Sequence, residues 1–236
     1  MFETIMFDLD GTLLPLDEDK FINLYFGGLA KIAAQINLEH GRFMDALASG
    51  VKAMLSNDGG ETNYNRFWKT FCTDLNLETA VVEQLFLKYY LTDFKKCRVS
   101  SWDNPLALPL IRFLKQKGKR IILATNPLFP LVAIKERMSW INLEIVDFSD
   151  ITTYENSSFS KPKYQYYQEI IQRHALDVNQ TLMIGNDASE DMIAGVLGVK
   201  TYLVTDCLKN EANLDLSAFR RGSFQDLDTY LRSTVK

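Results

Sequence analysis

The chain is poor in histidine, cysteine and proline, and it has no long hydrophobic run. Of its 236 residues, only 2 are histidine, 3 are cysteine and 6 are proline. The cysteines lie far apart without a CxxC pair, so we expect neither a zinc site nor a disulfide framework. No apolar stretch approaches the length of a membrane span, and strand-like sequence begins where a signal peptide would stand. We therefore expect a cytoplasmic protein without a membrane partner.

An excess of positive charge is also missing. Lys and Arg together number 26 and Asp and Glu 30, a net charge of −4, so a nucleic-acid partner is not expected. The 47% hydrophobic and 24% charged residues are typical of a globular protein. We expect a monomer or a weak homodimer. No GxGxxG or Walker sequence is present, so nucleotide binding through those loops is not expected either. His40 and His174 are interpreted as surface residues.

Short apolar runs alternate with helical stretches over much of the chain. We predict strands at 3–7, 120–124, 143–146, 181–184 and 200–204, and helices at 106–117, 163–174, 188–197 and from 223 onward. Such alternation favours parallel pairing with right-handed crossovers. The predicted fold class is therefore α/β, with a doubly wound parallel sheet.

The segment between the first two predicted strands differs from the rest. It contains helical runs near 18–38, 42–56, 63–74 and 78–92, and no convincing strand. Its many aromatic residues recur at helical spacing, which is typical of the core of a helical bundle. We therefore predict two units: an α/β core formed by residues 1–15 and 100–236, and an inserted all-helical domain formed by residues 16–99.

Polar residues stand at the ends of several predicted strands. In open parallel sheets, ligands bind outside the carboxyl ends of the strands, so residues there are candidates for function. We expect these side chains to meet at one edge of the sheet. They are Asp8 and Asp10 after the first strand, Thr125 and Asn126 after the second, Lys161 before the helix at 163, and Asp187 with Asp191 after the fourth.

This set of residues suits reaction at a phosphate ester. Asp8 and Asp187 can hold Mg²⁺, which prefers carboxylate and carbonyl oxygens. Lys161 adds positive charge and Thr125 adds hydrogen-bond donors for the phosphate oxygens. Asp8 could then attack phosphorus, while Asp10 would protonate the leaving oxygen and later activate water. Gly11 permits the tight exit from the strand.

These motifs resemble those of the haloacid dehalogenase superfamily of phosphatases and phosphotransferases. The sequence Asp-Leu-Asp-Gly-Thr at 8–12 is similar to its first motif, Thr125 to its second, Lys161 to its third, and Gly-Asn-Asp at 185–187 with Asp191 to its fourth. The insert at 16–99 resembles the helical cap of that superfamily in position and helicity.

The resemblance implies a Mg²⁺-dependent phosphatase that hydrolyses a small phosphorylated metabolite through an aspartyl-phosphate on Asp8. It also implies three groups of site residues. The catalytic residues are Asp8 and Asp10; the phosphate-binding residues are Thr125, Asn126 and Lys161; the metal ligands are Asp8, Asp10 and Asp187, with Asp191 orienting Lys161 or a metal-bound water.

Other functions stay open on the sequence. A 2-haloacid dehalogenase would need neither an acid at position 10 nor a metal. A phosphosugar mutase of the β-phosphoglucomutase type typically has a histidine early in the first cap helix, and residues 18–34 contain none. A phospho-accepting binding module would use Asp8 without needing Asp10. Relatives similar to phosphoglycolate phosphatases usually have an acidic residue at position 15, where this chain has Pro15, so the substrate is not named.

Overall fold

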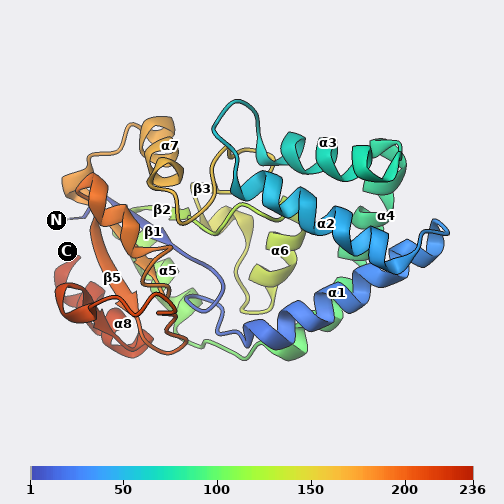
Figure 1. The fold of residues 1–236 in the computed structure, drawn as a ribbon. Coiled ribbons are helices and arrows are strands. Elements are labelled where there is room, and N and C mark those ends of the chain that lie inside the picture. The colour runs from blue at the N-terminus through green and yellow to red at the C-terminus, as the bar shows by residue number, and fades with distance from the viewer. Residues whose placement is uncertain (1, 236) are drawn as a thin grey trace.

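The computed structural model describes residues 2–235, and within them one sheet contains six strands, all parallel. The strands lie in the order β3-β2-β1-β4-β5-β6, which places β1 in the interior of the sheet (Figure 1). Phe7 of β1 pairs with Leu123 of β2 on one side and with Ile184 of β4 on the other. The doubly wound α/β fold is confirmed. The strands are β1 (Thr4–Phe7), β2 (Arg120–Leu123), β3 (Asp150–Ile151), β4 (Thr181–Gly185), β5 (Lys200–Val204) and β6 (Arg220–Gly222).

Helices cover both faces of the sheet because successive strand residues point to opposite sides. Ile5 and Phe7 belong to the core that includes α5 (Ala107–Gln116), α6 (Leu131–Ser139) and α8 (Phe224–Thr234). Met6 belongs to the core on the other face, with α7 (Tyr164–His174) and the 3₁₀ helix η4 (Met192–Leu197). Among residues 2–235, no helix combines the length and apolar character needed to cross a membrane.

Four helices and a 3₁₀ helix fill the chain between β1 and α5. They gather on the side of the molecule opposite to the two termini (Figure 1). The predicted aromatic core is confirmed: Phe67 and Phe71 stack with centroids 5.5 Å apart, and Trp68 meets Phe86 at 5.3 Å. The boundaries of a separate cap at 16–99 stay a prediction. The elements are α1 (Glu18–Gln35), α2 (His40–Leu55), α3 (Asn63–Leu75), α4 (Thr79–Leu91) and η1 (Asp93–Ser100).

The strand predicted at 143–146 is wrong. The chain there forms a turn and the 3₁₀ helix η2 (Ile145–Asp147), because the Glu144 backbone N–H donates to Asp147 Oδ2 at 2.8 Å. Val146 is 73% exposed, so the apolar run is not buried as a central strand would be. The strand next to β2 is instead β3, at 150–151.

Other differences concern elements with weak sequence patterns. The helix predicted at 188–197 consists of turns followed by η4, which ends at Gly198 with φ +87°. Helix α6 and strand β6 were not predicted. In contrast, the predicted start of the last helix is confirmed, since Ser223 and Asp226 form a capping box on α8.

Candidate active site

A buried lysine joins two carboxylates at the end of β1. Asp8 directly follows the strand, and its backbone N–H donates to the Ile184 carbonyl at 2.9 Å, which extends the pairing with β4. Lys161 Nζ lies 2.8 Å from Asp8 Oδ1 and 2.6 Å from Asp191 Oδ1. The Lys161 side chain is only 1% exposed. The structure thus brings these three predicted site residues into direct contact.

Asp191 is held in place by the loop that follows β4. Its Oδ2 accepts a hydrogen bond from the Asp187 backbone N–H at 2.9 Å. A Cβ on Gly185 would lie 2.1 Å from the Asp191 carboxylate, so only glycine permits this approach. Asp191 thus meets Lys161 with a fixed carboxylate, and its role of orienting Lys161 or a metal-bound water stays a prediction.

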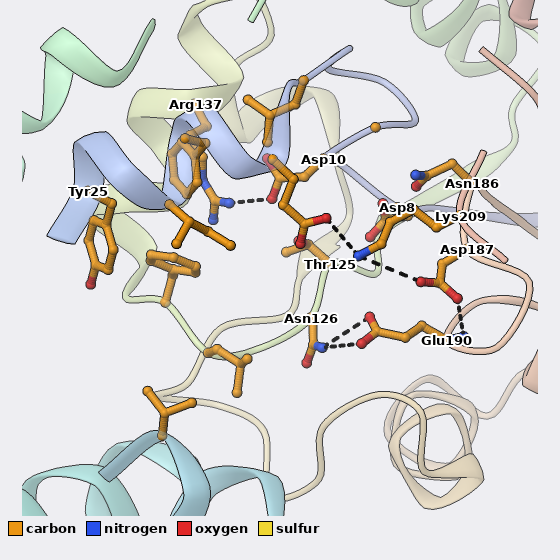
Figure 2. Close-up of a pocket in the computed structure, with 18 of the residues that line it drawn as sticks. Asp8, Asp10, Tyr25, Thr125, Asn126, Arg137, Asn186, Asp187, Glu190 and Lys209 are labelled. Atoms are coloured by element: carbon orange, nitrogen blue, oxygen red, sulfur yellow. Dashed lines mark hydrogen bonds and ion pairs between the residues drawn. The ribbon is translucent and has the colours of Figure 1, made fainter. Parts of the chain in front are cut away.

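Asp187 lies on the same loop, and one of its oxygens has no backbone contact within residues 2–235. Its Oδ1 accepts from the backbone N–H groups of Ser189 at 2.7 Å and Glu190 at 2.9 Å. Its Oδ2 is 3.9 Å from Lys209 Nζ, which also lies 2.7 Å from Glu18 Oε2 at the start of α1. Lys209 thus links the first turn of the helical insert to the acidic loop of the core (Figure 2).

Asp10 points to a different partner from Asp8. Its Oδ2 forms an ion pair with Nη1 of Arg137, a residue of α6 (Figure 2). The turn after Asp10 depends on Gly11, which has φ +81° and whose Cβ would lie 2.3 Å from Asn186 Nδ2. The two carboxylates of the first motif are therefore separated, one on Lys161 and the other on Arg137.

Thr125 and Asn126 follow β2 and contribute to the same site. The Thr125 carbonyl accepts hydrogen bonds from the hydroxyls of Thr152 at 2.7 Å and Tyr166 at 2.9 Å, which fixes this loop. Asn126 Oδ1 accepts from the Lys161 backbone N–H at 3.3 Å, and its Nδ2 donates to Glu190 at 3.2 Å. Asn126 therefore connects the Lys161 loop to the loop after β4.

A cavity of about 770 Å³ joins these residues to the helical insert. This volume lies in the range of small-molecule sites. Lys161 is the one predicted site residue that does not line the cavity, since it lies behind Asp8 and Asp191. The lining includes Asp8, Asp10, Thr125, Asn126, Asp187 and Asp191 from the core, and aromatic residues such as Phe21, Tyr25, Phe26, Phe67 and Tyr90 from the insert.

Burial dominates the electrostatics of the site. It raises the pKa of Asp8 and, to about 6, the pKa of Asp191, while the Lys161 ammonium opposes both shifts. Burial alone would lower the pKa of Lys161, but the Asp191 and Asp8 carboxylates raise it well above its ordinary value. Burial also raises the pKa of Asp10, with Arg137 opposing, and the pKa of Glu190. A further cation would be stabilised among these desolvated acids.

The residues fit a magnesium ion held mainly by substrate and water. Within residues 2–235, no three His, Cys, Asp or Glu side chains gather as a metal site. Asp8 pairs with Lys161 and Asp10 with Arg137, each through one oxygen, so the predicted ligand set of Asp8, Asp10 and Asp187 stays a prediction. Asp187 Oδ2 has only the long Lys209 contact among the described residues. Mg²⁺ typically takes one or two carboxylates, several waters and a substrate phosphate, which matches this donor set.

Three site residues were missed from the sequence: Arg137, Lys209 and Glu190. Arg137 interrupts the apolar face of α6, and this helix was not predicted. A charged residue on an apolar helix face could have indicated Arg137 only if the helix itself had been predicted. Lys209 lies in a loop after β5, and no pattern in that loop distinguishes it from a solvated lysine. Glu190 lies next to Asp191, but its contact with Asn126 depends on the fold alone.

Comparison with known proteins assigns the family. A family model described as a haloacid dehalogenase-like hydrolase matches residues 2–197, which is most of the chain. The protein therefore belongs to the haloacid dehalogenase-like hydrolases, as its motifs suggested. No match is found among the curated proteins.

Solved structures of this family share the fold at low sequence identity. A HAD phosphatase from Thermococcus onnurineus is 17% identical, with a TM-score of 0.60 and 100% of both chains covered. The magnesium-bound HAD-hydrolase YfnB from Bacillus subtilis is 20% identical, with a TM-score of 0.57, covering 98% of this chain and 99% of that one. The L-2-haloacid dehalogenase RSc1362 is 16% identical, with a TM-score of 0.55, covering 98% and 99%. These likenesses support the fold and include both phosphatase and dehalogenase.

Proposed function

We propose that this hydrolase is a Mg²⁺-dependent phosphatase that acts on a small phosphorylated metabolite through an aspartyl-phosphate on Asp8. The observation that carries the proposal is the pairing of Asp8 with the buried Lys161 at 2.8 Å, beside the loop that holds Asp187. This arrangement gives an anionic nucleophile together with a fixed positive charge. The positive charge is needed because a carboxylate nucleophile and an anionic phosphate repel each other.

The acid at position 10 favours a phosphatase over a dehalogenase. Displacement of a halide releases a stable anion, which needs no proton, whereas release of an alkoxide does. Asp10 lines the cavity and its pKa is raised by burial, which suits a group that must carry a proton. Asp187 adds a second carboxylate for a cation, for which a dehalogenase has no need.

In the first half of the reaction, an oxygen of Asp8 attacks phosphorus and the bond to the ester oxygen breaks. Asp10 gives its proton to that departing oxygen, so the alcohol leaves neutral. The donors near Thr125 and Asn126 stabilise the negative charge on the transferred phosphoryl group, and the Lys161 ammonium, which lies behind Asp8, adds its positive charge through space. Asp191 keeps Lys161 in place for this role.

In the second half, water attacks the phosphorus of the aspartyl-phosphate. Asp10, now ionised, takes the proton from that water, and the bond between phosphorus and Asp8 breaks to release inorganic phosphate. Asp8 returns to its carboxylate form and Asp10 to its protonated form. Asp8 and Asp187 would hold Mg²⁺, which would supply charge neutralisation and alignment of the reacting groups.

The helical insert is proposed to act as a cap that excludes water and selects the leaving group. Its aromatic residues form much of the cavity wall, and α1 reaches the acidic loop through the 2.7 Å contact of Glu18 with Lys209. The core would then supply the chemistry and the insert the specificity. A monomer or weak homodimer with no nucleic-acid or membrane partner is the expected form.

The test is phosphate release from a panel of phosphorylated sugars, nucleotides and small acids in the presence of Mg²⁺, combined with acid quenching. Mass spectrometry of the quenched enzyme should find a phosphoryl group on Asp8. Asp8→Asn should lose it, and Asp45→Asn, which alters an exposed acid on α2, should keep it. Halide release from a 2-haloacid without metal would instead indicate a dehalogenase. A sugar isomer formed in excess of free phosphate would indicate a mutase.

A further inference from the structure

Arg137 occupies a position where the pattern of its helix calls for an apolar side chain. The buried face of α6 is formed by Ala133, Ile134, Arg137 and Met138. The Arg137 side chain is 1% exposed, like its apolar neighbours. An arginine rarely lies so deep unless it is paired, and an apolar residue of similar size is often as stable there. Stability of the helix therefore does not explain an arginine at position 137, and its contacts must.

The contact that Arg137 makes is with the proposed acid of the reaction. Its Nη1 pairs with Asp10 Oδ2, across 127 positions of sequence. Two aromatic rings hold the guanidinium: its Cζ lies 4.4 Å from the centroid of Phe129 and 5.8 Å from that of Phe21. Stacking of this kind fixes the plane of an arginine. The orientation of Asp10 is therefore imposed by a rigid partner.

The pair is incomplete in a way that stability does not explain. Among the described residues, Arg137 Nε, Arg137 Nη2 and Asp10 Oδ1 are buried without a hydrogen-bond partner. Unsatisfied buried polar groups destabilise a fold, and arginine–carboxylate pairs are frequently bidentate, which satisfies both oxygens. Here one oxygen is held and the other is left free. Such local departures from good packing are expected at functional sites.

We infer that Arg137 is a positioning residue for the general acid. It holds Oδ2 of Asp10 so that Oδ1 stays free to give its proton to the leaving oxygen and to take one from the attacking water. This inference rests on the proposed phosphatase function and adds to it a residue outside the four motifs. Phe21 belongs to α1 of the insert. Its contact with Arg137 therefore links the position of the insert on the core to the position of Asp10.

The test compares a substrate that needs the acid with one that does not. Glycerol 2-phosphate has a poor leaving group, whereas p-nitrophenyl phosphate has a leaving group that departs with little help. Arg137→Met should lower kcat/KM for glycerol 2-phosphate by about 10- to 100-fold, since a displaced catalytic group costs up to about that factor. The burst rate of p-nitrophenol release should change by less than about threefold. Arg232→Met is the matched control, because Arg232 also pairs with an aspartate and stacks on a phenylalanine, but on α8.

A double-mutant cycle separates positioning from a general loss of structure. In the Asp10→Asn background, Arg137→Met should lower kcat/KM for glycerol 2-phosphate by less than about twofold, because the group it positions is already disabled. Arg137→Lys keeps the positive charge but not the planar guanidinium, and it should lower kcat/KM for glycerol 2-phosphate by less than Arg137→Met does. If Arg137→Met does not fold, the comparison of the two substrates with Arg137→Lys tests the positioning role.

Two results are distinguishable. If the wild type releases phosphate but the Arg137 variants slow both substrates equally, or if their losses multiply with that of Asp10→Asn, the positioning role is overturned and the phosphatase function stands. If the wild type releases no phosphate from either compound with Mg²⁺, the proposed function fails and the role of Arg137 fails with it.

Discussion

Replacing Lys161 by methionine tests the electrostatic core of the site. The substitution keeps an unbranched side chain one atom shorter and removes the ammonium between Asp8 and Asp191. Lys161 donates two charge-assisted hydrogen bonds, at 2.8 and 2.6 Å, each worth about 1.5–3 kcal/mol. Breaking a buried ion pair costs about 3–5 kcal/mol. We therefore expect Lys161→Met to lower the free energy of unfolding by about 3–5 kcal/mol at pH 8.

The loss should depend on pH in a defined direction. Burial already raises the pKa of Asp191 to about 6 with Lys161 opposing, so removal of the lysine must raise it further. A carboxyl whose folded-state pKa is raised contributes stability that is complete below its unfolded pKa of about 3.9 and is lost as pH rises through the folded value. Each proton involved changes stability by about 1.4 kcal/mol per pH unit. The variant should therefore lose at least about 1 kcal/mol more at pH 8 than at pH 5.

Urea unfolding in EDTA at both pH values measures these losses. Lys163→Met is a suitable control, because Lys163 Nζ donates to the neutral Asn57 carbonyl at 2.6 Å. That variant loses one charge-assisted hydrogen bond, worth about 1.5–3 kcal/mol, and its loss should be the same at both pH values. A loss below about 1 kcal/mol for Lys161→Met, or an equal loss at both pH values, would refute the reasoning.

Three further predictions concern activity. Asp8→Asn keeps the size of the nucleophile but not its charge, so kcat should fall at least about 10³-fold while the circular dichroism spectrum is unchanged; a tenth of wild-type activity would contradict the covalent mechanism. EDTA should abolish phosphate release, Mg²⁺ should restore it and Ca²⁺ should inhibit, because the larger ion misaligns the reacting groups; full activity in chelator would argue against a metal. Asp10→Asn should give a burst of about one equivalent of p-nitrophenol followed by slow turnover, as rapid mixing would detect, whereas linear release would contradict its second role as base.

Much of the fold and site follows from local pattern. The alternation of apolar runs and helices predicts the parallel sheet, and the polar residues after β1, β2 and β4 converge because parallel strands end at one edge. The prediction at 143–146 failed because an apolar run does not show whether it is buried. The exposed Val146 and the turn closed by Asp147 decide against a strand there. β6 was missed since Arg220, Arg221 and Gly222 have no apolar pattern at all.

The parts of the site that were not predicted depend on contacts between distant segments. Arg137 meets Asp10 only when α6 and the loop after β1 pack together within the core, and Lys209 meets Glu18 only when the insert packs on the core. Neither pair leaves a local signature, because a charged residue has the same appearance in sequence whether it is solvated or buried. In contrast, site residues such as Asp8 and Thr125 were predicted because the apolar residues just before them mark the end of a strand.

The interior position of β1 has a consequence for folding during synthesis. Thr4 pairs with Arg120 on one side and with Thr181 on the other, so the first strand made must wait for partners made much later. Within the insert, α2 and α3 are neighbours in sequence and pack on each other, so this pair can form as it leaves the ribosome, since such contacts form faster than long-range strand pairs. Until β4 has been made, β1 therefore has one edge unpaired. The rate of folding should be governed by closure of this sheet rather than by the helices.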